Sequence, residues 1–213
     1  MMGIIVPYRN REEHLSKFLP HVEKFLKDAD YQIFIIEQTQ GKPFNRGKLL
    51  NIGFSIAKAS CSYVCFHDVD MLPLKADYSF PETPTHLATA VEQFNFEMPY
   101  PTYFGGVTLF SIQDFESVNG YANEYWGWGA EDDDLQFRCK IAGISIDSRK
   151  GFFTSLSHEK ATENDPLVLA NQDKLEEILY GPTELPEEGL KTLEYTVIAN
   201  SSDGKVHTYK VQI

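Results

Sequence analysis

Cysteine, positive charge and long apolar runs are all scarce in this sequence of 213 residues. Three cysteines are an odd and sparse set that forms no disulfide framework, so we expect reduced thiols at Cys61, Cys65 and Cys139. Lysine and arginine total 19 against 31 aspartates and glutamates, and the net charge of −12 argues against nucleic acid or an anionic membrane as the main partner. Because no apolar run reaches about 18 residues, we expect no membrane-spanning segment in this chain.

The apolar content, in contrast, is that of an ordinary folded protein. Hydrophobic residues make up 42% of the chain, and a chain of this length can bury a stable core without disulfides. We therefore expect one domain over residues 1–213. The negative charge does not exclude a phosphate ligand, because a bound divalent cation reverses the local sign of the charge.

The first 70 residues alternate between short apolar runs and helical patterns. Strands are predicted over residues 3–7, 31–36 and 62–67. A helix with an apolar stripe and Asn10 as its predicted N-cap follows the first strand, and a second helix is predicted over residues 45–59. This order predicts right-handed crossovers and a mainly parallel sheet flanked by helices, which is an α/β fold.

Polar side chains follow each of these three strands. In parallel α/β sheets, ligands bind beyond the carboxyl ends of the strands. The sequence therefore indicates a nucleotide pocket near the residues that follow the strands, which are Arg9 and Arg11, Glu37 and Gln38, and Asp68 and Asp70.

The second half of the chain is more mixed. The patterns predict further strands and helices, and the alternation near the end predicts a β-hairpin around Ser201–Gly204. The predicted ranges are strands 87–91 and 106–111, helices 112–118, 131–142 and 171–180, and the hairpin 193–213.

Two acidic segments are candidates for chemistry. In Asp68-Val69-Asp70, the side chains of residues i and i+2 can point the same way and hold a hard cation and a ribose. The alternative is a simple Asx turn that closes the strand.

The segment from Trp126 to Asp134 places four acids after two tryptophans and two glycines. It is either a solvated first turn of a helix or, as we favour, a sugar-stacking site with a carboxylate that takes a hydroxyl proton. At least one of the four acids should have a raised pKa.

A histidine and a basic group complete the candidates. His158 follows Ser155-Leu156-Ser157, and a lone histidine gains weight as a metal ligand only if it has a partner, for which Asp70 is the candidate. Arginines and polar residues near the first two strands suggest contacts to a diphosphate and a base, although surface cations are the alternative. This basic group consists of Arg9, Arg11, Asn45, Arg46 and Lys48.

With these segments in place, the sequence resembles the β-1,4-galactosyltransferases, including the xylosylprotein galactosyltransferases. The matching segments cover essentially the whole chain in order, and FNRGKLLN and WGWGAEDDD are the most specific. They are Val6–Arg11, Phe44–Asn51, Asp68–Asp70, Tyr103–Val107, Tyr125–Asp134, His158 with Asn164–Pro166, and Leu190–Val197.

The resemblance implies a GT-A-like nucleotide-sugar transferase fold and an inverting, metal-dependent transfer of galactose from UDP-galactose to a sugar hydroxyl of a glycan. It implies Mn²⁺ as the cofactor, with Mg²⁺ as the alternative. Residues 1–75 would form the nucleotide-binding half and residues 76–213 the acceptor-binding half, with mobile loops near 125–131 and 154–176.

The resemblance also implies roles for single residues. Asp132 would be the general base, and Asp70 and His158 would bind the metal. The donor would be bound by Pro7, Arg9, Arg11, Phe44, Arg46, Asp68, Val69, Asp70, Tyr103 and Trp128. The acceptor would be bound by Tyr103, Gly129, Glu131, Asp132 and Asp133. By the same resemblance, the ring of Tyr103 would favour galactose over N-acetylgalactosamine, because a bulky ring there leaves less room for an N-acetyl group.

This sequence departs from the family's pattern in three ways. A third metal ligand, which is methionine or histidine in the family, is replaced by Ser155 and Leu156, and a harder oxygen ligand favours Mg²⁺ over softer ions. The pocket for the acceptor N-acetyl group is replaced by Ala170, Asn171 and Lys174, so N-acetylglucosamine is not the expected acceptor. The family's disulfides and anchor are absent, which suggests a soluble, bacterial-type enzyme in the cytoplasm rather than the Golgi lumen.

Two other functions remain open at this stage. The same fold could use UDP-N-acetylgalactosamine or UDP-glucose as its donor. The chain could also be a non-catalytic module that binds a sugar or a nucleotide, although the presence of Asp70, Asp132 and His158 speaks against it.

Overall fold

The computed structural model describes residues 1–158, 161–162, 164–181 and 184–213. In these ranges the chain forms an eight-stranded sheet with the strand order β10-β11-β2-β1-β3-β7-β5-β8, and a three-stranded sheet with the order β4-β9-β6. The large sheet contains β1 (Met2–Tyr8), β2 (Tyr31–Gln38), β3 (Tyr63–His67), β5 (Thr85–His86), β7 (Val107–Ser111), β8 (Asp147–Ser148), β10 (Thr196–Asp203) and β11 (Val206–Gln212). The small sheet contains β4 (Met71–Lys75), β6 (Ala90–Val91) and β9 (Phe152–Ser155).

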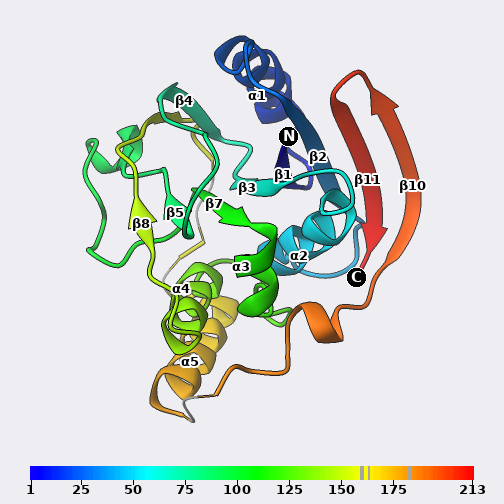
Figure 1. The fold of residues 1–213 in the computed structure, drawn as a ribbon. Coiled ribbons are helices and arrows are strands. Elements are labelled where there is room, and N and C mark those ends of the chain that lie inside the picture. Colours follow the sequence, from blue (N-terminus) through cyan, green and yellow to red (C-terminus); the bar gives the residue numbers. More distant parts are fainter. Residues whose placement is uncertain (159–160, 163, 182–183) are drawn as a thin grey trace.

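Helices cover both faces of the large sheet (Figure 1). Alternation along β1 explains why, since Ile4 and Val6 pack into one core cluster and Ile5 into the other. The first cluster includes α1 (Glu12–Phe25), and the second includes α2 (Arg46–Ala57), α3 (Ile112–Ser117) and α4 (Glu131–Ile141). Helix α5 (Pro166–Tyr180) packs beside α4. Two short 3₁₀ turns complete the elements, at Glu92–Phe94 and Leu190–Thr192.

The large sheet combines parallel and antiparallel strand pairs. Strands β11, β2, β1 and β3 are parallel neighbours, whereas β7 runs antiparallel to β3 and β5 runs antiparallel to β7. The segment between β3 and β7 returns the chain to the end of the sheet at which β3 finishes, because His67 pairs with Val107. The mixed α/β fold is therefore confirmed, with a parallel centre, antiparallel pairs on both sides of it, and a parallel β5–β8 pair at one edge.

The predicted strand over residues 87–91 is wrong. The chain bends there and crosses from one sheet to the other, so that β5 ends at His86 and β6 begins at Ala90. Before the bend, Thr85 pairs with Leu109 of the large sheet, and after it Ala90 pairs with Phe152 of the small sheet. The small sheet was not predicted, and β4 follows Asp70 directly.

Two helix starts also differ from the prediction. Helix α1 has Arg11 rather than Asn10 at its N-cap, and Asn10 has a left-handed backbone with φ of 52°. Its side chain instead accepts a hydrogen bond from Gln40. Helix α5 begins at Pro166 rather than near 171, because Asp165 caps the Leu167 amide and proline fits the first helical position. Residues 166–176 of the expected mobile loop over 154–176 are therefore regular helix, and residues 159–160 and 163 of it lie outside the described ranges.

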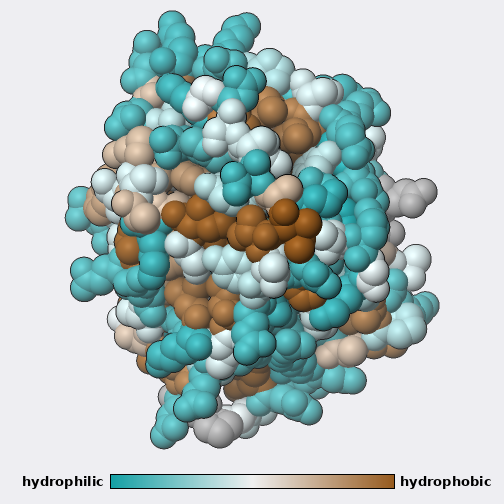
Figure 2. Space-filling view, turned by 90° about the vertical axis from the view of Figure 1, so that its right-hand side faces the viewer, coloured by the Kyte–Doolittle hydropathy of each residue, from teal (hydrophilic) through white to brown (hydrophobic). Residues whose placement is uncertain are grey.

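The C-terminal hairpin is confirmed, with β10 and β11 antiparallel. It also extends the large sheet, since β11 pairs in parallel with β2. All residues of β10 are exposed at the sheet edge, and hydrophobic side chains gather in a band across this side of the molecule (Figure 2).

The cysteines are buried free thiols, as expected. Within the described ranges, no helix has the length and apolarity needed to cross a bilayer.

Candidate active site

An arginine between two carboxylates lies at the centre of the site. Arg46 is the first residue of α2, Asp68 follows β3, and Glu131 is the first residue of α4. The Nε atom of Arg46 donates to Asp68 Oδ1 at 2.7 Å, and its Nη1 atom donates to Glu131 Oε1 at 3.3 Å. The three side chains are 14%, 25% and 11% exposed, respectively, so this ion-pair group is largely shielded from water.

Both carboxylates of this group hold their protons more tightly than usual. Burial raises the pKa of Asp68 to about 6, with Arg46 opposing the rise and Asp70 adding to it. Burial likewise raises the pKa of Glu131 to about 7, with Asp132 adding to the rise and Arg46 opposing it. The expectation that at least one acid of the cluster has a raised pKa is confirmed. One arginine is thus shared by more carboxylates than it can neutralise, which makes the site attractive to a cation.

Asp132 lies against the backbone of Gly105. A Cβ atom placed on Gly105 would collide with Asp132 Oδ2 and would stand 2.8 Å from the ring of Tyr103. The carbonyl of Gly105 accepts a hydrogen bond from His86 Nε2 at 2.9 Å, and burial lowers the pKa of His86 to about 4, so the imidazole is neutral. The predicted base, Asp132, and the predicted donor-selecting ring of Tyr103 therefore both lie against Gly105.

Asp133 contacts the aromatic side chain of Tyr100. Tyr100 donates its hydroxyl to Asp133 Oδ1 at 3.1 Å, and burial raises the pKa of Asp133 to about 6. The ring of Tyr100 stands edge-on to that of Tyr103, with centroids 5.5 Å apart, and Phe94 stands 5.9 Å from Tyr103. Carboxylates beside flat apolar rings suit a sugar, which offers both hydroxyl groups and C–H faces.

Asp70 and His158, which are 88 positions apart in sequence, meet as predicted. The Nε2 atom of His158 lies 3.0 Å from Asp70 Oδ2, and both side chains are largely buried. The small sheet brings them together, because Met71 pairs with Ser155 and the amide of Leu156 donates to the Asp70 carbonyl. One carboxylate and one imidazole fit Mn²⁺ or Mg²⁺. The described residues offer no group of three histidine, cysteine or acidic ligands, so bound phosphate, water or a hydroxyl would complete the shell.

The other predicted donor residues lie along the same edge of the large sheet. Arg9 stacks over the ring of Phe44 at 5.4 Å and donates to the carbonyl of Lys42 at 2.7 Å. Pro7 and Val69 are buried in the backbone framework. Arg11 occupies the N-cap of α1, and among the described residues its side chain makes no hydrogen bond or ion pair with Arg46, Asp68 or Glu131.

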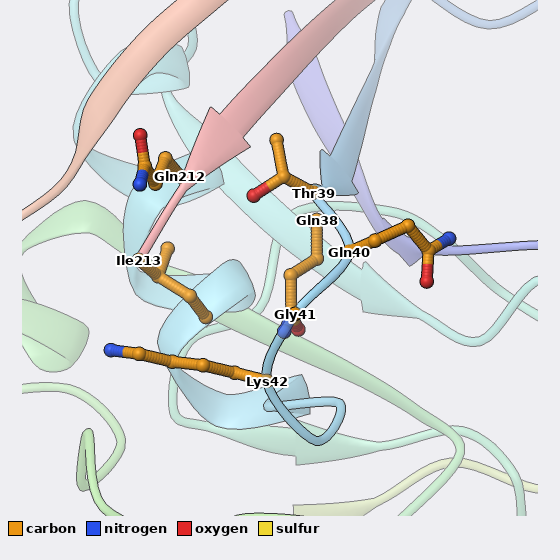
Figure 3. Close-up of a pocket in the computed structure, with 7 residues that line it drawn as sticks. All are labelled: Gln38, Thr39, Gln40, Gly41, Lys42, Gln212 and Ile213. Carbon is orange, nitrogen blue, oxygen red and sulfur yellow. The ribbon is translucent and has the colours of Figure 1, made fainter.

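A separate small pocket opens beside this edge. It has a volume of about 240 Å³ and lies where β2 and β11 end, with the side chains of Gln40 and Lys42 pointing to opposite sides (Figure 3). The ammonium group of Lys42 lies 5.2 Å from the ring of Trp126. The pocket therefore adjoins the loop Trp126–Ala130, which we call the tryptophan loop, but contains none of the predicted catalytic or metal-binding residues.

The loop from Trp126 to Ala130 covers the start of α4. The side chain of Trp128 is 58% exposed, and left-handed backbone at Gly127, Gly129 and Ala130 keeps the segment irregular. The loop packs on α5, at positions where the family's pocket for an N-acetyl group would lie. There Lys174 pairs with Glu188 at 3.2 Å, and Asn171 is turned to the loop backbone. An apolar pocket is not built at these two positions.

Sequence reasoning missed four residues of the site. Gly105, His86 and Tyr100 act on Asp132 and Asp133 only through contacts in space, which no local pattern signals. The hydroxyl of Tyr121 is buried without a hydrogen-bond partner among the described residues, and its pKa is raised by burial and by nearby Asp132.

Comparisons with known proteins match galactosyltransferases over most of the chain. A family model described as the N-terminal region of glycosyl transferase group 7 matches residues 1–80, and one described as the N-terminal domain of galactosyltransferase matches residues 85–161. The chain is 36% identical over 206 residues to β-1,4-galactosyltransferase 1 of Bos taurus, covering 92% of this chain and 50% of that protein. The chain spans about half the length of the curated relatives it matches.

Solved structures give the same result. The catalytic domain of Drosophila β1,4-galactosyltransferase 7 in complex with xylobiose superposes with a TM-score of 0.81 at 26% identity, covering 100% of this chain and 93% of that one. A mutant of that protein in complex with manganese, UDP-Gal and xylobiose superposes with a TM-score of 0.80 at 26% identity and the same coverage.

Proposed function

This chain belongs to the β-1,4-galactosyltransferase family, and we propose that it transfers galactose from UDP-galactose to a hydroxyl group of a saccharide acceptor. The observation that carries the proposal is the convergence, at one edge of the sheet, of the Asp70–His158 pair, the Arg46–Asp68–Glu131 group and Asp132. Together these groups provide a cation site, a charged donor site and a base.

The donor would bind to the nucleotide-binding half, at residues that lie on or beside β1, β3 and α2. Arg9 and Phe44 already stack on each other and would face the uridine, while Asp68 would receive the ribose. Asp70 and His158 would hold Mn²⁺, and the cation would neutralise charge on the departing diphosphate. The hydroxyl of Ser155 is a harder ligand than a thioether, so we propose that Mg²⁺ also supports turnover.

Asp132 would act as the general base. Its carboxylate would accept the proton of the acceptor hydroxyl as that oxygen bonds to the anomeric carbon. Attack from the face opposite to the departing UDP inverts the configuration of that carbon. Gly105 and its partner His86 hold Asp132 in place, and Glu131 and Asp133 would orient neighbouring hydroxyl groups.

For the acceptor, we propose a sugar without an N-acetyl group. Lys174 is engaged by Glu188 and by the ring of Tyr125, which lies 5.0 Å away, and Asn171 is buried against the tryptophan loop. Neither side chain forms an apolar wall. The xylobiose bound by the Drosophila enzyme is an acceptor-like sugar that lacks the N-acetyl group.

Galactose is preferred over N-acetylgalactosamine because the ring of Tyr103 occupies the space beside Asp132 and Gly105. A panel of UDP-sugars tests this preference on the wild type and on Tyr103→Leu, with UDP release as the readout. We expect wild-type turnover with UDP-galactose, and gain of UDP-N-acetylgalactosamine use in the variant. Unchanged donor preference in Tyr103→Leu would rule out the selecting role of Tyr103.

The enzymatic proposal itself is tested by calorimetry and turnover. UDP should bind only in the presence of Mn²⁺ or Mg²⁺, and UDP release from UDP-galactose should rise when an acceptor sugar is added. Absence of both effects would favour the alternative, a non-catalytic binding module. The cytoplasmic location expected from the sequence stays a prediction, which cell fractionation would test.

A further inference from the structure

One side chain of α5 holds the backbone of both tryptophans. Asn171 is 4% exposed, and its Nδ2 atom donates to the carbonyl of Trp126 at 3.0 Å and to the carbonyl of Trp128 at 3.1 Å. Since an amide nitrogen carries two hydrogens, both bonds can form at once. Both N–H groups of the Asn171 side chain therefore donate to the tryptophan loop, Trp126–Ala130.

The tryptophan loop needs such partners. Left-handed backbone at Gly127 (φ 82°), Gly129 (φ 96°) and Ala130 (φ 77°) prevents the regular bonding that would satisfy its carbonyl groups. On the opposite side, the amide of Gly127 donates to the carbonyl of Phe44 at 2.7 Å. Hydrogen bonds thus connect the tryptophan loop to Phe44, in the predicted nucleotide-binding half, and to Asn171 of α5.

Packing supports the same connection. A Cβ atom on Gly127 would stand 3.1 Å from the Cβ of Leu167, so α5 lies directly against the loop. Leu167 belongs to the first turn of α5, and Asn171 to the next. The side chain of Trp128 itself remains 58% exposed, so its own packing does little to fix its position. The backbone bonds of Asn171 are what orients it.

We propose that Asn171 is a positioning residue that holds the tryptophan loop, and with it the ring of Trp128, ready for the two sugar substrates, the donor and the acceptor. This inference rests on the proposed function for its kinetic consequence, but the structural part is independent of it. A loop that is already ordered does not lose conformational entropy when the substrate binds. Loss of the two bonds should therefore weaken binding in the ground state and the transition state equally.

The kinetic signature follows from that equality. Asn171→Asp keeps the side-chain volume but replaces the NH2 donor with an oxygen that faces two carbonyl oxygens. In this variant KM for UDP-galactose and KM for the acceptor should rise roughly 10- to 30-fold while kcat changes less than about 2-fold. Asn171→Ala should show the same direction. Gln172→Ala, on the exposed side of the same helix, is the matched control and should behave as the wild type.

A direct readout of the loop is available because Trp126 and Trp128 are the two tryptophans of the chain. Quenching of their fluorescence by acrylamide, and their fluorescence anisotropy, report on the tryptophan loop alone. In Asn171→Asp we expect stronger quenching and lower anisotropy than in the wild type, with far-UV circular dichroism unchanged. Saturating UDP, Mn²⁺ and acceptor should restore the wild-type anisotropy.

Two results would overturn the inference. Quenching and anisotropy equal to those of Gln172→Ala would show that Asn171 does not hold the loop. A looser loop with unchanged KM for both UDP-galactose and the acceptor would show that holding the loop does not serve binding. If the wild type itself turns over no donor, the proposed function fails, and fluorescence of the variants still decides whether Asn171 fixes the loop.

Discussion

Replacement of Glu131 by glutamine isolates one pH-dependent contribution to stability, because glutamine mimics the protonated glutamate at nearly equal volume. Burial raises the pKa of Glu131 from 4.5 to about 7, with Asp132 adding to the rise and Arg46 opposing it. In the unfolded chain the carboxyl group returns to its ordinary pKa. The folded protein therefore binds more protons than the unfolded protein between these two values.

The sign follows from that difference. The stability contributed by the protonated form is fully present below about pH 4.5 and is lost as the pH rises through about 7. A pKa rise from 4.5 to about 7 corresponds to about 3 kcal/mol of unfolding free energy. Glu131→Gln lacks this contribution at every pH. Relative to the variant, the wild type should lose about 3 kcal/mol of stability between about pH 4 and about pH 8.

Urea unfolding of the two proteins across this pH range measures the difference. Both should be studied with a chelator present, because a cation bound near Asp68 and Asp70 would stabilise the charged carboxylates and mask the effect. Comparing the two proteins cancels the titration of the other acids to a first approximation. A difference in unfolding free energy that does not change with pH would refute the claim that Glu131 is buried beside other negative charges.

Further substitutions probe the neighbours of Glu131. Asp132→Asn should lower kcat at least about 100-fold while leaving UDP binding by calorimetry unchanged, and near-normal turnover would refute its assignment as the base. Gly105→Ala should push Asp132 and the ring of Tyr103 out of place and lower kcat by about 100-fold, whereas unchanged kinetics would mean that Gly105 does not position the base. Tyr121→Phe removes a buried hydroxyl without a partner in the described part of the chain, so chemical denaturation should show a gain of about 1 kcal/mol, and a loss would mean that the hydroxyl is bonded in solution.

Much of the first half of the fold could be predicted from local patterns. Strong apolar runs before Arg9, Glu37 and Asp68 became β1, β2 and β3, and the side chain of Asn45 caps α2 by accepting from the amide of Lys48. These elements follow from near-neighbour physics, namely alternation, capping and turn chemistry. Their consequence, polar residues at one edge of a parallel sheet, follows from topology.

The second half depended on contacts that no local pattern records. The segment 87–91 has the composition of one strand, but Ala90 pairs with Phe152 and Thr85 with Leu109, in different sheets. Asp165 and Pro166 are a typical helix start, but the apolar periodicity that follows them is weak, so the helix was predicted to begin only near residue 171.

Of the candidate site, too, one part could be predicted from the sequence and another part could not. The sequence itself offered Asp70 as the candidate partner of His158 across 88 positions, the resemblance gave both as metal ligands, and the structure places them 3.0 Å apart. The supports behind the catalytic groups, His86 behind Gly105 and Asn171 behind Trp128, became visible only in three dimensions. Their side chains bond to backbone carbonyl groups, and such bonds leave no spacing rule in the sequence.

The anomeric configuration of the product tests the central claim most directly, because it requires transfer, metal dependence and attack on the opposite face at once. The protein would be incubated with UDP-galactose, Mn²⁺ and a panel of saccharides without N-acetyl groups, and the product analysed by proton NMR. Galactose is α-linked in the donor, so direct displacement predicts a β-linked galactoside that forms only with the cation and not with Asp132→Asn. An α-linked product, or the same yield from Asp132→Asn, would contradict it.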